Sequence, residues 1–379
     1  MTSVILTNAK VVTEDCCFLG TLVIEHGTIT AVDRGTTKVP GAIDCDGDHL
    51  LPGLVELHTD NLEKHVQPRA GVRWPTSAAA LSHDAQITAA GITTVFDAVA
   101  LGDVSEDSDR LRNLSDMVTA ISGIVSRGLA RARHYLHLRC EVSYEKLPDL
   151  VNPLIDDPLV KLISVMDHAP GQRQFADPET YARFYRDNYK LDEDTLRREM
   201  ERHAWSSREY APFHRTWVSE LCRQRGLPMA SHDDATRADV SESVTLGVRI
   251  AEFPTTMEAA TASRTEGLSV MMGAPNLVRG QSHSGNVSAL ALAEEGALDI
   301  LSSDYMPSSL LMAVLKLWRH AGWRLPDAVS LVTARPARAV GLRRLGTLEP
   351  GNIGDVIRVH FETDVVAVRQ VWRAGERVM

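Results

Sequence analysis

The motif His58-Thr59-Asp60 places an imidazole and a carboxylate at the end of a predicted β-strand. In an extended segment, residues i and i+2 point to the same side, so both side chains can reach one ion. Imidazole and carboxylate groups are the ligands that zinc and related divalent cations prefer. Histidines and aspartates near strand ends more often form ordinary hydrogen bonds, so this motif alone is weak evidence for a metal site.

Four further predicted strands end in residues of the same chemical types. These residues are Glu141, Asp167-His168, His232-Asp233-Asp234 and Asp304. Strand after strand ending in ligand-type residues is difficult to explain by packing, and together the motifs predict a divalent-metal site. A carboxylate that bridges two cations lets them acidify one water molecule, so the predicted chemistry is metal-assisted hydrolysis.

Eight apolar runs separated by turns supply the strands that must hold these residues. They span 54–58, 93–97, 135–140, 160–166, 227–231, 248–253, 268–272 and 298–302. Consecutive apolar positions are typical of strands buried on both faces of a parallel sheet. Helical patterns lie between them, including apolar residues at helical spacing over 111–125, which Gly128 ends. This alternation predicts a (β/α)8 barrel, a TIM-like α/β fold with its active site at the carboxyl ends of the strands.

A doubly wound α/β sheet is the competing fold, but no glycine-rich phosphate turn follows an early strand. Pro326 starts one further helix, which we expect to end near Gly341. A long, charged connection precedes the fifth strand. We expect either a helical insertion or lid over about residues 171–226 or a solvated decoration of the barrel.

β-rich segments at both ends of the chain predict a second, smaller domain. Short β-branched runs separated by glycines occur within residues 1–52 and 341–379. We expect these two segments to form one composite β-sandwich domain and residues 53–340 to form the barrel.

Composition and charge limit the classes of partner. The chain has 40 Lys and Arg against 50 Asp and Glu, a formal net charge of −10, and 44% hydrophobic residues. These values exclude wholesale disorder and argue against nucleic acid and anionic membranes as partners. No secretory signal or long apolar run is present, and an odd number of cysteines indicates reduced thiols, so we expect a cytoplasmic protein.

Longer motifs resemble those of the amidohydrolase superfamily. LLPGLVELHTD at 50–60 resembles its opening signature and GITTV at 91–95 its second strand, while TARPA at 333–337 and GNIGD at 351–355 resemble its closing segments. The resemblance extends over the whole chain, and it implies a metal-dependent barrel with a split β domain.

A narrower set of motifs resembles one branch of that superfamily, which acts in the carbon–phosphorus lyase pathway of phosphonate catabolism. The motifs are HTDNL at 58–62, SHDA at 82–85, MDHAPGQRQF at 166–175, SHDDAT at 231–236, AEFPTT at 251–256, GAPN at 273–276, RGQSHSGN at 279–286 and LSSDY at 301–305. This resemblance implies hydrolysis of the 5-triphosphate of α-D-ribose 1-methylphosphonate 5-triphosphate to the 5-phosphate and diphosphate. It also implies divalent metal, which we expect to be two ions of zinc, manganese or iron.

The resemblance suggests roles for individual residues, although the chain departs from the usual superfamily pattern. Asp60 stands where a second histidine is usual, and Glu141 is the candidate for the place of a bridging carboxylated lysine. Strand six ends in Glu252 without the usual histidine, so either Glu252 or His168 completes the second metal site. We prefer His168, because a neutral imidazole adds no negative charge, and Glu252 can then orient another ligand. The predicted metal ligands are His58, Asp60, Glu141, His168, His232 and Asp304.

Asp304 is also the predicted catalytic residue, because it is placed to accept a proton from the attacking water. In-line attack on phosphorus otherwise needs mainly positioning and positive charge. The predicted substrate contacts are Arg69, Arg173, Arg279, His283 and His83. Arginine forks match phosphate oxygens, and the Gly/Ser-rich loop around His283 can present N–H groups to an anion. His83 lies in a predicted helix over 78–90, where a buried structural role is the alternative.

Two other functions stay open from the sequence. A deaminase or deacylase that acts on C–N bonds fits the superfamily resemblance, and it would release ammonia or carboxylate instead of diphosphate. A non-catalytic scaffold fits only if the protein binds no metal. We expect a small, anionic, phosphorylated substrate, and the sequence leaves a homodimer open.

Overall fold

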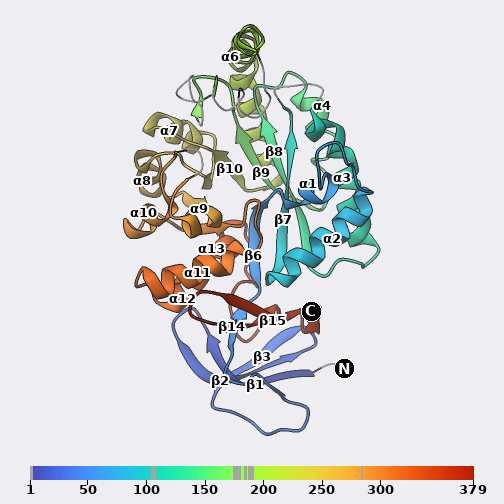
Figure 1. Cartoon of the computed structure of the whole chain (residues 1–379), viewed down its shortest axis with the longest axis vertical. Coiled ribbons are helices and arrows are strands. Elements are labelled where there is room, and N and C mark those ends of the chain that lie inside the picture. The colour runs from blue at the N-terminus through green and yellow to red at the C-terminus, as the bar shows by residue number, and fades with distance from the viewer. Residues whose placement is uncertain (1–2, 104–107, 174–180, 183–185, 187–191, 283–284) are drawn as a thin grey trace.

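The computed structural model describes residues 3–103, 108–173, 181–182, 186, 192–282 and 285–379. Its larger part is a barrel of eight parallel strands, hydrogen-bonded in chain order from β6 to β13 (Figure 1). The strands are β6 Leu54–Thr59, β7 Ile92–Leu101, β8 Arg133–Glu141, β9 Val160–Met166, β10 Met229–His232, β11 Ile250–Glu252, β12 Ser269–Gly273 and β13 Ile300–Ser302. A parallel bridge between Thr59 and Asp304 brings the end of the last strand back to the first. The predicted (β/α)8 barrel is therefore confirmed.

The apolar runs in the sequence locate the barrel strands well, and the run over 160–166 coincides with β9. One helix prediction is wrong. The segment that begins near Pro326 forms two helices, α12 Leu325–Ser330 and α13 Ala334–Ala339. Thr333 separates them with φ −136° and ψ −85°. Pro336 then lies in the first turn of α13, where its missing N–H breaks no helical hydrogen bond.

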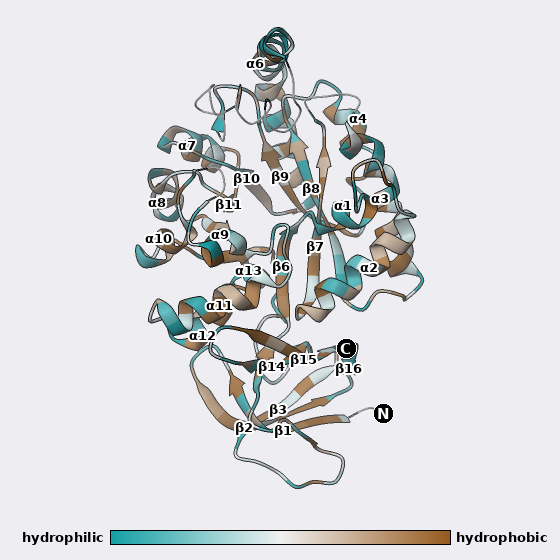
Figure 2. Cartoon of the chain, in the orientation of Figure 1, coloured by the Kyte–Doolittle hydropathy of each residue, from teal (hydrophilic) through white to brown (hydrophobic). Residues whose placement is uncertain are grey.

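Helices cover the outside of the barrel. They are α1 Asn61–Val66, α2 Thr76–Ala89, α3 Asp109–Ser126, α4 Leu147–Val151, α6 Glu193–Arg225, α7 Arg237–Thr245, α8 Met257–Thr265, α9 Ala274–Arg279, α10 Ala289–Glu294 and α11 Ser309–His320, followed by α12 and α13. Figure 2 shows that the strands carry mainly hydrophobic residues, whereas the helices also carry hydrophilic ones. Apolar side chains such as Ile121 of α3 and Leu138 of β8 are buried together between the two layers. Among the helices of the described ranges, none combines the length and apolar character needed to cross a membrane.

The two ends of the chain share one sheet. Its strands are β1 Ser3–Val12, β2 Cys17–Glu25, β3 Thr28–Arg34, β4 Ile43–Asp44, β5 His49–Pro52, β14 Val356–Phe361, β15 Val366–Arg373 and β16 Glu376–Arg377. The order β16-β15-β14-β5-β1-β2-β3 joins the ends through the antiparallel pair β5 and β14, while β4 pairs with β1. A bridge between Thr28 and Ile353 links the far side of the sheet to the start of β14. The sheet thus folds over its own core, which includes Leu22 and Trp372.

Helix α6 is a 33-residue helix between β9 and β10. The Asp192 side chain caps its first turn by accepting a hydrogen bond from the Thr195 N–H, and Gly226 ends it with a left-handed φ of 63°. In Figure 1 it lies opposite the terminal sheet, at the end of the barrel to which the strand arrows point. Its position therefore brings it to the face where barrel enzymes carry their active sites.

A buried polar network fastens helix α2 to the barrel wall. Asp97 of β7 accepts hydrogen bonds from His83 Nε2 of α2 and His134 Nδ1 of β8, both at 2.7 Å. His134 Nε2 lies 3.2 Å from Asp84 of α2. Burial lowers the pKa of His134, but the facing carboxylates of Asp97 and Asp84 raise it to about 9. His134 therefore carries a positive charge between two buried carboxylates at neutral pH.

This network predicts a specific pH dependence of stability. A histidine whose pKa is raised to about 9 on folding stabilises the protein fully below its ordinary pKa of 6.5, and this contribution is lost as the pH rises through about 9. We expect His134→Gln to lower the free energy of unfolding at pH 6 by on the order of 3 kcal/mol, and by less at pH 9.5. Urea denaturation between these pH values measures the difference. The exposed His320→Gln serves as the control, and a wild-type-to-variant difference that does not change with pH would contradict the ion pair.

Candidate active site

Histidine and carboxylate side chains gather at the carboxyl ends of the barrel strands. They are His58 on β6, Glu141 on β8, His168 after β9, His232 on β10, Glu252 on β11 and Asp304 after β13. Parallel strands end on the same side of a barrel, so residues far apart in the chain meet there. Six residues named from the sequence thus lie at one end of the fold.

Glu252 joins the imidazoles of two other strands. One carboxylate oxygen accepts a hydrogen bond from His58 Nδ1 and the other from His232 Nδ1, each at 3.0 Å. The two imidazole rings stack with their centroids 5.7 Å apart. Burial raises the pKa of Glu252, but the neighbouring His137 and His58 and the hydrogen bonds from His232 and His58 bring it well below its ordinary value. Because Nδ1 is used by the carboxylate, Nε2 is the nitrogen through which each ring can bind a cation.

His168 is held in the same way by Glu141. Its Nδ1 donates to a Glu141 oxygen at 2.7 Å, and the second Glu141 oxygen accepts the Ser143 hydroxyl at 2.5 Å. Ser143 in turn accepts a hydrogen bond from His203 Nε2 of α6 at 2.9 Å. Burial raises the pKa of Glu141, but the hydrogen bond and charge of His168 lower it to about 2. Both Glu141 oxygens thus contact protein donors.

Asp233 belongs to the cluster, although the sequence placed it only at the end of the fifth strand and not among the predicted ligands. Its carboxylate lies 3.4 Å from His232 Nε2 and 3.7 Å from His168 Nε2. Adjacent residues of a strand normally point to opposite sides, so His232 and Asp233 would not be expected to share a site. The left-handed φ of 59° at Asp233 turns its side chain back beside His232. Only a signal for this turn could have shown that Asp233 shares a site with His232, and the residue type alone does not supply one.

Asp304 lies beside Asp60 after the end of β13. Its backbone N–H donates to His58 O at 3.2 Å, and its own φ is 53°, also left-handed. Burial, and then the charge of Asp60, raise the pKa of Asp304 to about 7. One Asp60 oxygen is buried without a hydrogen-bond partner. A buried carboxylate oxygen of this kind is costly unless a cation or a donor satisfies it.

The donor set fits a divalent cation. Ligand atoms lie within 4.8 Å of one another in two groups that share His232, namely His58, His232 and Glu252, and His168, His232 and Asp233. Imidazole nitrogens held by carboxylates at Nδ1, together with free carboxylate oxygens, are typical of zinc and related metal sites. A third group consists of His83, Asp97 and His134. These residues form the hydrogen-bonded network between α2 and the barrel wall described above.

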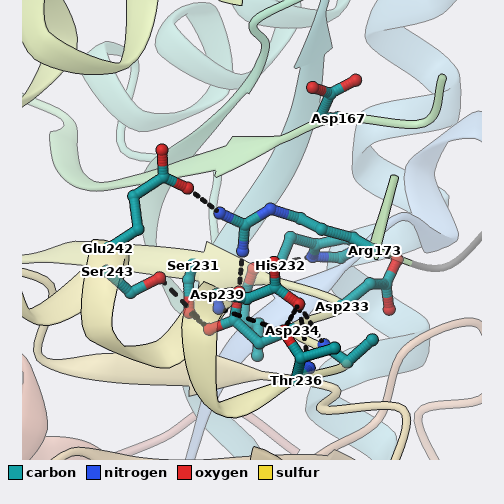
Figure 3. A network of polar contacts seen from close by, with 12 residues as sticks. Asp167, Arg173, Ser231, His232, Asp233, Asp234, Thr236, Asp239, Glu242 and Ser243 are labelled. Atoms are coloured by element: carbon teal, nitrogen blue, oxygen red, sulfur yellow. Dashed lines mark hydrogen bonds and ion pairs between the residues drawn. The ribbon is translucent and has the colours of Figure 1, made fainter. Parts of the chain in front are cut away.

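The predicted substrate contacts occupy different surroundings. Arg69 and Arg279 are exposed. Arg173 is buried, and its guanidinium pairs with Asp234 and, at 3.0 Å, with Glu242 (Figure 3). His83 is fully buried and donates to Asp97, so it lies in the α2 network rather than among the ligand-type residues. His283 lies outside the described residues.

Helix α6 supports the strand ends through a buried polar stripe. The Ser207 hydroxyl and the Arg215 guanidinium both donate to the same Asp167 oxygen at 2.8 Å. Asp167 directly precedes His168, and His203 reaches Glu141 through Ser143. Helix α6 is therefore hydrogen-bonded to Asp167, which precedes His168, and to Ser143, which donates to Glu141.

Comparisons with known proteins agree with this architecture. The model of the amidohydrolase family matches residues 212–378. Alpha-D-ribose 1-methylphosphonate 5-triphosphate diphosphatase of Escherichia coli (strain K12) is 47% identical over 376 residues, which cover 99% of this chain and 100% of that protein. Both resemblances inferred from the sequence motifs are confirmed.

Solved structures with low sequence identity share the fold. N-acetylglucosamine-6-phosphate deacetylase from Pasteurella multocida superposes with a TM-score of 0.65 at 13% identity, covering 99% of each chain. 5-methylcytosine deaminase from Klebsiella pneumoniae superposes with a TM-score of 0.65 at 16% identity, covering 99% of this chain and 98% of that one. At such identities the similarity shows the fold alone.

The contacts of Glu252 generate a prediction about metal affinity. Glu252→Gln keeps the size of the side chain, but an amide can accept a hydrogen bond from only one of the two imidazoles. We expect the affinity for divalent metal to fall by about 10–100-fold, because one of the two rings loses its hydrogen-bond acceptor. Competition with a chromogenic chelator measures this, with the exposed Glu258→Gln as control. Equal affinities of Glu252→Gln and the wild type would show that the rings do not depend on Glu252.

Proposed function

Because the chain belongs to the amidohydrolase superfamily and, within it, to the α-D-ribose 1-methylphosphonate 5-triphosphate diphosphatase family, we propose that it hydrolyses that triphosphate to the 5-phosphate and diphosphate. The observation that carries the proposal is the 47% identity, which extends over 100% of the diphosphatase. The ligand-type residues at the strand ends support it, because they come from both halves of the chain and the identity to the diphosphatase extends over both halves.

Hydrolysis adds water across a P–O–P anhydride. The water oxygen bonds to phosphorus, the bridging P–O bond breaks, and the water must give up a proton. Asp304 accepts this proton, because its carboxylate follows the end of β13 among the ligand-type residues, within reach of the attacking water. The same group can then pass the proton to the departing phosphate.

The candidate ligands divide into residues that contact cations and residues that orient them. When bound, divalent cations acidify the attacking water and offset charge on the phosphoryl oxygens. We propose two ions of zinc, manganese or iron, held by His58, Asp60, His168, His232 and Asp233, with Asp304 beside them. Glu252 and Glu141 orient the imidazoles, because their oxygens already accept Nδ1–H donors. These contacts favour His168 over Glu252 as a ligand and an orienting role for Glu141.

A product assay tests the proposed reaction. We expect the metal-replete protein to release diphosphate and the ribosyl 5-phosphate in equal amounts, because one anhydride bond is cleaved, as measured by 31P NMR. A chelator should abolish the reaction, and added zinc, manganese or iron(II) should restore it. Release of orthophosphate instead of diphosphate would contradict the assignment. Activity only on C–N substrates, seen as release of ammonia, would also contradict it.

Replacement of Asp304 tests the proton acceptor. Asp304→Asn keeps the size of the side chain but removes the basic carboxylate, so we expect kcat to fall by at least about 10²-fold. The amount of bound metal and the thermal unfolding temperature of the variant should equal those of the wild type, which would show that the site is otherwise intact. The exposed Asp364→Asn is the matched control. A kcat of Asp304→Asn close to that of the wild type would exclude Asp304 as the acceptor.

A further inference from the structure

Arg139 is an interior arginine beside the candidate ligands. It lies on β8 two residues before Glu141, so both side chains leave the same side of the strand. Its side chain is buried, with 7% of its surface exposed, and Nη2 lies 3.5 Å from His232 Nε2. No sequence motif identifies Arg139, because it is an isolated arginine in the middle of an apolar run.

Arg139 differs from the other buried arginines of this face in its partners. Arg173 pairs with Asp234 and Glu242, and Arg215 pairs with Asp167 and Glu242. Over the ranges that the structure describes, no carboxylate lies within ion-pair distance of Arg139, and its buried Nε has no hydrogen-bond partner. The guanidinium donors are therefore largely unused by the fold.

An unpaired buried guanidinium is expensive to maintain. Transfer of a charged group out of water without a counter-ion costs several kcal/mol, and arginines are rarely buried unless they are paired. Burial raises the pKa of Glu63, Asp233 and Asp304, and the charge of Arg139 acts to lower it, but none of these carboxylates forms an ion pair with Arg139. Packing and pairing therefore do not account for this side chain. The nearby His232 cannot act as its counter-ion, because an imidazole carries no negative charge, and the charge of Arg139 contributes to lowering the pKa of His58 in the same cluster. Cations held by the neighbouring histidines and carboxylates would increase the positive charge around Arg139 further.

We propose that Arg139 binds the non-bridging oxygens of the phosphoryl group at which the anhydride is cleaved. This assignment rests on the proposed diphosphatase function and deepens it. The planar guanidinium presents N–H groups in a fork that matches two oxygens of a phosphate. Charge spreads over these oxygens as the bridging P–O bond breaks, and a fixed donor in a dry site stabilises that charge. Arg139 donates hydrogen bonds only and remains protonated throughout.

The exposed arginines of the predicted substrate set complement this role. Arg69 and Arg279 lie at the surface, where solvent screens their charge, so they suit contacts with the outer parts of a triphosphate. Arg139 lies within 3.5 Å of a ligand-type histidine, which places its fork at the reacting centre. Inorganic diphosphate contains the same phosphoryl oxygens and is therefore a direct probe of Arg139.

Arg139→Gln, Arg139→Lys and Arg139→Ala test the proposal in the metal-replete, full-length protein. We expect metal content to stay close to that of the wild type and the thermal unfolding temperature to stay equal or rise, because the long contact with His232 is the one hydrogen bond of the guanidinium among the described residues and an unpaired buried charge is costly. We expect kcat/KM to fall by about 10²–10³-fold in Arg139→Gln, and calorimetry should show weaker binding of inorganic diphosphate. Free guanidinium ion should partly restore the activity of Arg139→Ala, whereas ammonium ion should not.

Arg133→Lys is the matched control on the same strand, since Arg133 pairs with Asp355 at the other end of β8. It should leave activity and diphosphate affinity unchanged. Wild-type kcat/KM and diphosphate affinity in Arg139→Gln would overturn the proposal. Loss of metal or of folding that explains the lost activity, without guanidinium rescue, would overturn it in favour of a structural role. If the wild type itself does not hydrolyse the triphosphate, the proposed function fails, while the diphosphate affinities of the wild type and Arg139→Gln still decide the role of Arg139.

Discussion

Glu252 supplies the contact on which the rest of the candidate site depends. Its fully buried carboxylate connects His58 of β6 with His232 of β10, two strands that are not neighbours in the barrel. By accepting both Nδ1 protons, it determines which nitrogen of each ring can bind a cation. The position of Glu252 at the end of β11 thus sets the orientation of two imidazoles from opposite parts of the barrel sheet. An apolar residue there would satisfy packing but would leave two buried imidazoles without orientation.

Helix α6 extends this principle beyond the barrel. An amphipathic helix usually buries apolar residues, and α6 does so at Val218 and Cys222. Toward its other end the buried stripe is polar, and His203, Ser207 and Arg215 bond to Ser143 and Asp167 near the candidate ligands. Buried polar groups stabilise a fold only when their partners are well placed, so this stripe favours one position of α6 over nearby alternatives. The insertion is therefore part of the support for Glu141 and His168.

The distribution of charge explains how a protein with a negative net charge can bind an anionic triphosphate. The formal net charge of −10 argues against nucleic acid as a partner, but it does not describe the local field at the barrel mouth. Asp60, Asp233 and Asp304 are carboxylates that divalent cations would neutralise. Arg139 adds a positive charge that no described carboxylate pairs. The site can therefore be positive toward phosphate while the surface remains acidic.

The sequence by itself determined the barrel and most of the ligand-type residues, because parallel strands buried on both faces read as apolar runs and active-site groups follow their ends. The break between α12 and α13 was missed, since a proline that ends one helix can equally lie in the first turn of the next. Tertiary structure decided the rest. Asp233 enters the site through a left-handed backbone turn, Glu252 gains two histidine partners, Arg173 is taken up by an ion pair and Arg139 is left without one. Residue type and spacing cannot settle these outcomes, because each depends on which side chains from distant strands share a buried volume.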